Sequence, residues 1–410
     1  MLTTNASLAT TVLAALGSLL IARALGPAGR GDWAVISALA LLIGTVGTLG
    51  VPTAVSYGLA QLPYARRAMY LRAALCAALL LAMLAGTACT AVALMLTLGD
   101  APTLVLALSG CISAAVVMHQ IVQHAVLTGG TLRWYAAAQI APPALTLLAL
   151  GMLAASGSLS VLAVTAVSAL SGASGAAVAL RGLQRAGLLR RRPLWLPLRE
   201  VVTTLRPDLT YAVTTFATIS LSQVVHRVDV LLVSGYKGST AAGLYAVAVQ
   251  VADLLMVVPA ALGMVLFRRA ATSVSGHWGD ALRTLAWTAP IAAAAALLVG
   301  VAAGSLIEGF FGAEFAGAVA PLRWLLPGVV LLGLQSLVSS YLAGRGRPRA
   351  VLYAWTIAAA FTIVADLIVV PVHGIEGAAI VSSVSYLLVL GLHVKPLLDI
   401  RRHDLVGAPR

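Results

Sequence analysis

The sequence predicts an all-α integral membrane protein with about 12 transmembrane helices arranged as two six-helix lobes. Of its 410 residues, 60% are hydrophobic and only 10% are charged. Apolar runs recur along the whole chain, and basic residues gather in alternate connections between them. A soluble domain has roughly 45–50% apolar and about 25% charged residues. The composition therefore excludes a soluble enzyme, a disordered chain and a disulfide scaffold.

Twelve apolar runs are long enough to cross a bilayer, which takes about 20 residues each. They leave short connections and no room for a large soluble domain. The longest connection, 181–208, is strongly basic and separates six runs from six. The runs cover 3–22, 33–60, 73–97, 104–127, 136–155, 160–180, 209–234, 243–267, 284–305, 319–343, 350–371 and 378–397.

This spacing divides the chain into four segments. We expect an N-terminal six-helix lobe at 1–183 and a C-terminal six-helix lobe at 209–397. A basic cytoplasmic linker at 184–208 joins them, and a cytoplasmic tail follows at 398–410.

The net charge of +13 reports orientation in the membrane. Lys and Arg are enriched in the cytoplasmic loops of membrane proteins. With the N-terminus inside, the cytoplasmic loops and the tail hold 21 of the 26 basic residues, whereas the outer loops hold only Arg23, Arg30 and Lys237. We therefore expect both termini in the cytoplasm of a bacterium, a location in its cytoplasmic membrane, and no nucleic-acid partner.

The two halves resemble each other. The segment 31–35 opens the second run as 243–247 opens the eighth, and both runs carry a late proline, Pro52 and Pro259. Six helices per half that start on the same side predict a repeat related by a pseudo-two-fold axis along the membrane normal.

Motifs for catalysis are missing from the sequence. A P-loop places its lysine after a glycine, but Lys237 follows a tyrosine and Lys395 follows a valine. There is no HExxH zinc motif, and His119 and His124 are spaced for different faces of a helix. The three cysteines show no CxxC spacing. We expect neither an enzyme nor a bound cofactor or metal.

Polar side chains inside the membrane are the candidates for function, because they are costly there. The seventh run carries the most: Ser220, Gln223 and Arg227 share one helical face, and His226 and Asp229 lie on another. Asp253 lies near the middle of the eighth run, and Arg323 lies in the first turn of the tenth.

Several of these residues have a structural alternative. His226 is spaced to pair with Asp229, and Arg323 is placed to snorkel to the headgroups. Asp229 and Asp366 lie toward the outer ends of their runs and are placed for the interface. Arg227 and Asp253 lie deeper, which favours a place in a cavity, where they would pair with each other.

Five segments together resemble the Wzx-type polysaccharide, or O-antigen, flippases. The family pattern "AR-LGP-GRG" follows the first helix, and "GLYSVA", "LLPG", "YL-G-G-P" and "P-YGI-GAA" occur in the C-terminal half. Val230 stands where the family usually has Arg, and Asp366 stands for a common Asn. The matching segments here, in order along the chain, are 22–32, 243–248, 326–328, 341–349 and 371–379.

The resemblance implies membership of the multidrug/oligosaccharidyl-lipid/polysaccharide (MOP) exporter superfamily, with two lobes around a central cavity. Such proteins move an undecaprenyl-diphosphate-linked oligosaccharide from the cytoplasmic to the outer leaflet by alternating access. A diphosphate needs cations in a low-dielectric cavity, and a glycan needs polar partners. The substrate-binding candidates are Arg227, Gln223, Ser220, His226, Arg23, Arg30 and Arg323.

Asp253 and Asp229 are the candidates for coupling to H⁺ or Na⁺, because an acidic group would repel a diphosphate unless paired or protonated. Expected partners are the lipid-linked oligosaccharide, membrane lipids, a polysaccharide polymerase and glycosyltransferases. Two alternatives within the superfamily stay open. A cation-coupled drug exporter would carry acidic residues deep in the first lobe, and a peptidoglycan lipid-precursor flippase would carry several cavity arginines there; neither set is present.

Overall fold

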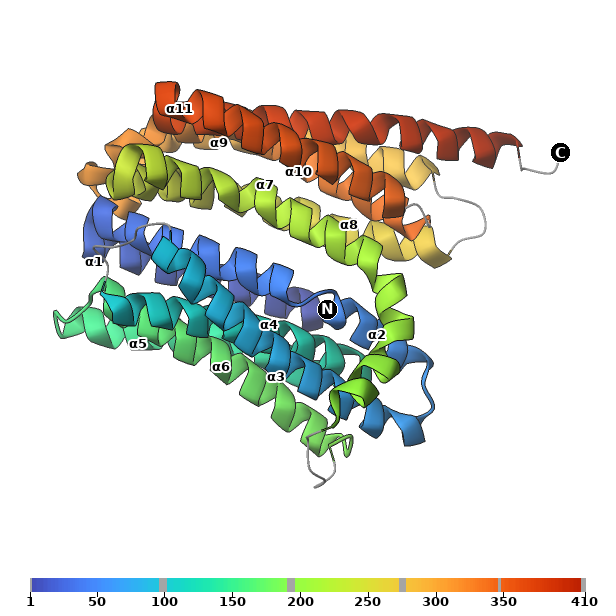
Figure 1. Cartoon of the computed structure of the whole chain (residues 1–410). Coiled ribbons are helices and arrows are strands. Elements are labelled where there is room, and N and C mark those ends of the chain that lie inside the picture. Colours follow the sequence, from blue (N-terminus) through green and yellow to red (C-terminus); the bar gives the residue numbers. More distant parts are fainter. Residues whose placement is uncertain (1, 96–101, 190–195, 273–277, 346–347, 407–410) are drawn as a thin grey trace. The chain divides into compact units, whose positions relative to one another are not determined.

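The computed structural model describes residues 2–95, 102–189, 196–272, 278–345 and 348–406 (Figure 1). Across these residues the secondary structure is helical, with no strand. The chain divides into two compact units, Met1–Ser220 and Leu221–Arg410. Each unit is a bundle of apolar helices, as the composition predicts.

The first unit contains six helices and the start of a seventh. In this unit α4 packs against α3 and α6, and α5 packs against α1 and α6. The core lies where α3 and α4 meet, around side chains such as Leu71, Ile121 and Val126. The helices are α1 (Leu2–Gly47), α2 (Val51–Gln61), α3 (Tyr64–Met95), α4 (Thr103–Gly129), α5 (Leu132–Ala155), α6 (Val161–Arg185) and α7 (Leu198–Asp253).

The second unit begins within α7 and has its closest packing between α10 and α11. Its core includes Tyr341, Leu342 and Trp355. Gly328 allows the close approach, because a Cβ atom there would lie 2.5 Å from the Cα of Ser383. The further elements are η1 (Leu254–Met256), α8 (Val257–Thr272), α9 (Trp278–Phe311), η2 (Ala313–Ala318), α10 (Val319–Gly344) and α11 (Pro348–Val406).

Three of the helices are each long enough for two crossings, which confirms the prediction of about 12 spans. Among the described residues, nine helical stretches are apolar and long enough to cross a membrane, and three of these run over 42, 56 and 52 residues. Each of the three is interrupted by one glycine with positive φ: Gly26, Gly238 and Gly374. These glycines fall in the predicted outer connections 23–32, 235–242 and 372–377. Residues with a side chain rarely adopt that backbone conformation.

The second span of each half is broken, although the sequence predicts continuous runs at 33–60 and 243–267. In the first half, α1 ends at Gly47 and α2 begins at Val51, with Gly50 at a φ of 80°. In the second half, the 3₁₀ turn η1 separates α7 from α8. Pro52 and Pro259 follow the two breaks, and proline suits the first turn of a new helix. The same break within each unit supports the internal repeat.

The predicted domain boundaries fall within helices, and they stay predictions. The segment 184–208 contains the end of α6 and the start of α7. The division by contacts falls later, within α7 after Ser220. Helix α11 continues from the predicted lobe into the predicted tail, and residues 190–195 and 407–410 lie outside the described part.

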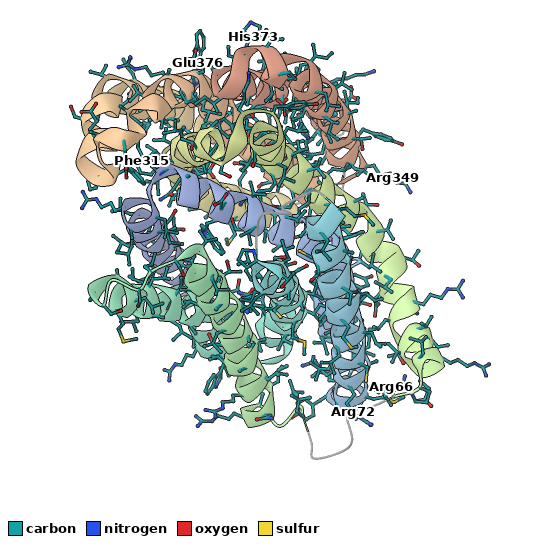
Figure 2. The ribbon with its side chains drawn as sticks, turned by 60° about the vertical axis from the view of Figure 1, so that its left-hand side comes forward. Arg66, Arg72, Phe315, Arg349, His373 and Glu376 are labelled. Atoms are coloured by element: carbon teal, nitrogen blue, oxygen red, sulfur yellow. The ribbon has the colours of Figure 1, made fainter. Side chains whose placement is uncertain are left out.

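Charged side chains lie at the ends of the predicted spans. Arg66 and Arg72 lie near the start of α3, and Arg349 lies at the start of α11 (Figure 2). His373 and Glu376 flank the bend of α11 at Gly374 (Figure 2). Each group therefore occupies one end of a membrane-spanning helix.

Candidate functional site

Five predicted site residues meet in one polar pocket of the second unit. The pocket has a volume of about 110 Å³. Tyr386 of α11 and two apolar residues of α10 close it on the other sides. The five residues, all on α7, are Gln223, His226, Arg227, Asp229 and Asp253.

Arg227 and Gln223 bring unsatisfied polar atoms to this pocket. Among the described residues, the Nε of Arg227 and the Oε1 of Gln223 are buried and have no hydrogen-bond partner. Ser220, one turn earlier on α7, has a hydroxyl in the same condition. A buried polar group without a partner costs about 1–3 kcal/mol. Three of them along one helical face indicate a place for a polar ligand or water.

Asp253 supplies the negative charge of the pocket. Coulombic attraction links its carboxylate to His226 and Arg227, whereas Asp229 repels it. The helix breaks directly after Asp253, because η1 begins at Leu254. The carboxylate therefore lies at a discontinuity of the eighth span, in the pocket that Arg227 also lines.

Asp229 is a buried anchor between α7 and α11 rather than a side chain exposed on the surface. Only 2% of its surface is exposed. Its Oδ2 accepts hydrogen bonds from the Tyr245 hydroxyl at 2.6 Å and from the Ser382 hydroxyl at 3.2 Å. Its Oδ1 accepts from the Val230 backbone N–H at 2.7 Å. One buried carboxylate thus links three parts of the chain, at 229–230, 245 and 382.

His226 does not pair with Asp229, which was its structural alternative. Its Nδ1 instead bonds to the backbone carbonyl of Ser222. The imidazole lies near two aromatic rings, with its ring centroid 5.7 Å from that of Trp355 and 5.6 Å from that of Tyr386. One side of the polar pocket is therefore aromatic.

Asp366 is the residue that the sequence placed least well. It has no exposed surface, rather than lying at the membrane interface. Among the described residues, neither of its carboxylate oxygens has a hydrogen-bond partner. It lies close enough to Asp229 for the two charges to repel. The sequence identifies this acidic side chain inside the apolar run 350–371, but its burial depends on packing that the sequence does not reveal.

The remaining predicted residues lie elsewhere in their units. In the first unit, Arg30 is 7% exposed and donates from Nη2 to the Ser18 hydroxyl at 3.1 Å, while Arg23 is exposed. In the second unit, the Nε of Arg323 donates to the carbonyl of Gly300 at 3.1 Å, away from the polar pocket. The structure therefore does not bring Arg323 together with Arg227.

No metal-binding cluster is present in the described ranges, where no three His, Cys, Asp or Glu side chains group suitably. The side chains of His119 and His124 have different neighbours, as their spacing predicts. The Nδ1 of His124 bonds to the hydroxyl of Ser56 at 2.9 Å. His119 instead faces Gly175, where an added Cβ would lie 2.7 Å from its Cε1.

Comparison with known proteins shows which protein family and which solved structures this chain matches. The model of the family described as "Polysaccharide biosynthesis protein" matches residues 1–272. No curated protein matches the sequence. The lipid II flippase MurJ, in an inward closed conformation, has a TM-score of 0.75 and 15% identity, over 98% of this chain and 90% of that one.

Two structures of a multidrug resistance MATE family transporter of the MOP superfamily are similar as well. The inward-facing one has a TM-score of 0.72 and 13% identity, over 97% of this chain and 96% of that one. The outward-facing one has a TM-score of 0.59 and 14% identity, over 99% and 97%. At such identities the likeness concerns the fold.

Proposed function

The chain belongs to the polysaccharide biosynthesis protein family, and we propose that it flips an undecaprenyl-diphosphate-linked oligosaccharide across the cytoplasmic membrane. Its membership of the MOP superfamily and its multi-pass helical fold are established by the family match and the similar structures. The Wzx-type cargo, the direction of transport and the absence of catalysis are parts of the proposal.

The buried Nε of Arg227, which has no hydrogen-bond partner among the described residues, is the observation that carries the proposal. A buried donor without an acceptor is costly, and an anion that enters the pocket would compensate it. A diphosphate presents several oxygens to a guanidinium, which binds phosphate through paired N–H donors. The amide N–H groups of Gln223 and the hydroxyl of Ser220, on the same face of α7, add hydrogen-bond donors for the other oxygens of the diphosphate.

The size of the pocket limits what enters it. A volume of about 110 Å³ is below the roughly 300–1,000 Å³ of sites that enclose a small molecule. We therefore assign the pocket to the phosphate groups alone, with the oligosaccharide outside it. His226, whose ring lies near Trp355 and Tyr386, lines the pocket and would lie beside the phosphate groups. Arg23 and Arg30 of the first unit remain proposed contacts for the anion at the outer end of the path.

Coupling to H⁺ or Na⁺ is assigned to the acidic residues of the second unit. Asp253 interacts with Arg227, so a cation on Asp253 would leave the guanidinium available to the diphosphate. Asp229 holds α7 to α11 and would transmit the change in charge to the helices. The transporter would then alternate between states with its site open to one side and then the other.

The proposal is tested in cells that depend on this protein for a surface glycan. Deleting the gene should abolish the surface glycan and cause its lipid-linked precursor to accumulate in the inner leaflet. Restoring the wild-type chain should reverse both effects. Accumulation of the peptidoglycan lipid precursor instead would favour that alternative cargo, and a normal surface glycan with drug sensitivity would favour a drug exporter.

The proposed partners follow from the proposed cargo. A polysaccharide polymerase would consume the flipped oligosaccharide, and glycosyltransferases would build it on the cytoplasmic side. Cross-linking in cells between this chain and a polymerase should depend on an active glycosylation pathway if the partners meet during transfer.

A further inference from the structure

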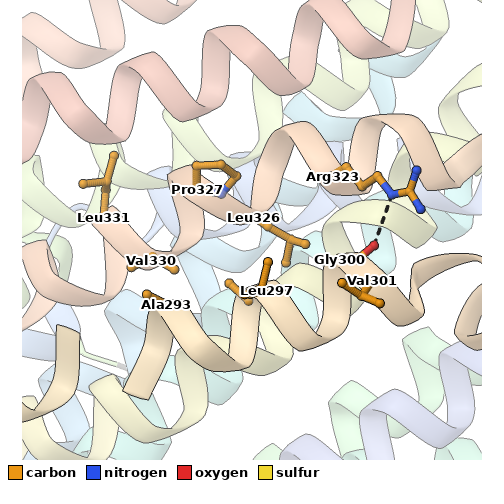
Figure 3. Close-up of a pocket in the computed structure, with 10 residues that line it drawn as sticks. Ala293, Leu297, Gly300, Val301, Arg323, Leu326, Pro327, Val330 and Leu331 are labelled. Carbon is orange, nitrogen blue, oxygen red and sulfur yellow. Dashed lines mark hydrogen bonds between the residues drawn. The ribbon is translucent and has the colours of Figure 1, made fainter. Parts of the chain in front are cut away.

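An apolar groove runs between α9 and α10 in the second unit, apart from the polar pocket. Its volume is about 850 Å³. Figure 3 shows Ala293, Leu297 and Val301 on α9 facing Leu326 and Val330 on α10. Every residue that lines the groove is apolar or glycine except Arg323.

The groove is shaped for an alkyl chain. Residues 293, 297 and 301 follow one another at the spacing of one helical face, so they form a continuous apolar strip along α9. Leu297 is 70% exposed and Val301 is 75% exposed, although α9 lies within an apolar span. Gly300 adds depth, because a Cβ atom there would come within 3.2 Å of the Leu326 side chain.

Arg323 marks one end of this strip. Its Nε donates to the carbonyl of Gly300 at 3.1 Å, which fixes the base of the guanidinium (Figure 3). Among the described residues, the Gly300 carbonyl is the hydrogen-bond partner of the Arg323 side chain, and no acidic residue lines the groove. The terminal nitrogens are therefore held at the end of the groove with their donors available.

We propose that the groove binds an anionic glycerophospholipid, with one acyl chain along α9 and the phosphodiester on Arg323. The orientation expected from the charge count places Arg323 toward the outer leaflet, so the lipid would come from that leaflet. The chain gains apolar contact in proportion to the surface it covers. The phosphate gains charge-assisted hydrogen bonds from the free side of the guanidinium.

The charge at the groove favours a phospholipid over the polyprenyl diphosphate of the proposed cargo. A phosphodiester carries one negative charge, which matches the single cation that lines the groove. In the proposed function the diphosphate is held by Arg227 together with the polar groups of Gln223 and Ser220, whereas the groove offers no polar side chain besides Arg323. The lipid site is therefore distinct from the transport site around Arg227, and it stands even if the transported cargo is another molecule.

Native mass spectrometry of the purified full-length protein tests this assignment without a transport assay. The probes are phosphatidylglycerol and phosphatidylcholine with identical acyl chains, added in turn and together. The wild type should retain phosphatidylglycerol preferentially. Arg323→Gln should lower that preference about tenfold, as expected for the loss of a hydrogen bond to a charged group. Arg283→Gln, an exposed arginine of α9 that does not line the groove, should leave it unchanged.

A second pair of variants tests the acyl chain separately from the charge. Ala293→Trp fills the groove, so it should remove both phospholipids from the site. Ala294→Trp is the matched control, because residue 294 is exposed on the same helix and does not line the groove. Equal retention of both lipids by the wild type and Arg323→Gln would overturn the proposal, as would retention unchanged by Ala293→Trp. Arg323-dependent displacement of phosphatidylglycerol by a polyprenyl phosphate would assign the groove to the cargo lipid instead.

Discussion

Arg227 is the residue on which the proposed function depends most. Its Nε is buried without a hydrogen-bond partner in the described structure, and Asp253 is the acidic residue whose attraction it feels at the same pocket. This arrangement suits a guanidinium that exchanges one anion for another during a transport cycle. A purely structural arginine would be expected to hold a fixed set of acceptors.

We predict that Arg227→Ala lowers glycan export about tenfold or more, because it removes a charge-assisted contact to the phosphate. Arg227→Lys should restore part of the activity, since lysine keeps the charge but loses the planar pair of donors. Export is measured as surface glycan at matched protein levels in the membrane. Full export by Arg227→Ala would exclude this residue from the transport site.

Asp366 provides a test that separates folding from coupling. Its carboxylate is buried with no hydrogen-bond partner in the described structure. Removing a buried charge that lacks partners is neutral or stabilising for a fold, so Asp366→Asn should leave the thermal midpoint of the purified protein unchanged or raise it. If Asp366 also takes part in coupling, the same variant should lose the dependence of transport on the ion gradient. A lower midpoint would show that the carboxylate has partners in the folded protein.

Asp229 differs from Asp366, because three hydrogen-bond donors contact its carboxylate. Tyr245→Phe removes one donor and should destabilise the protein by about 1–3 kcal/mol. The midpoint should therefore fall by several degrees in a thermal-shift assay. Tyr353→Phe is the control, since Tyr353 is 67% exposed, and it should change the midpoint little. Equal effects of the two variants would contradict the anchoring role of Asp229.

At the scale of the elements, the glycines with positive φ explain how the long helices bend. Gly238 has a φ of 82° and nothing within 4 Å of an added Cβ, so only its backbone conformation forbids a side chain. Gly235 lies in the same stretch with equal space around it and no positive φ. The two positions differ in backbone conformation alone.

Gly238→Ala should therefore destabilise the protein by roughly 1–3 kcal/mol, the cost of a positive φ with an extended ψ for a residue with a side chain. Gly235→Ala should be neutral or stabilising by up to about 1 kcal/mol, because alanine favours helix over glycine. Chemical denaturation of the purified protein measures both. A loss of stability in Gly235→Ala that matches the loss in Gly238→Ala would contradict the assigned bend.

The elements were largely predictable from the sequence, whereas their contacts were not. Apolar runs of about 20 residues located the spans, whereas the breaks before Val51 and Val257 were not predicted. The hydrogen-bond partners of Asp229 could not be predicted from the sequence, because Ser382 lies 153 residues away along the chain. The groove beside Arg323 depends on how α9 packs on α10, which neither periodicity nor charge reveals.

At the scale of the whole molecule, the sorting of charge predicts the orientation of every loop. A cysteine placed at Thr240, an exposed position in a predicted outer connection, should react with a membrane-impermeant maleimide in intact cells. A cysteine at Ala65, exposed in a predicted inner connection, should react only after permeabilisation. The native Cys111 is exposed and should be replaced by serine first. Reaction of both positions from the same side would refute the topology.

Transport of a lipid-linked glycan is the central claim, and reconstitution tests it most directly. Purified protein is placed in proteoliposomes that carry a fluorescent undecaprenyl-diphosphate oligosaccharide in both leaflets, and an impermeant quencher is added outside. With the wild type and a suitable ion gradient, the account predicts that quenching proceeds beyond the outer-leaflet fraction, whereas it stops at that fraction with Arg227→Ala. Quenching that stops at the outer-leaflet fraction for the wild type under both H⁺ and Na⁺ gradients would contradict the account.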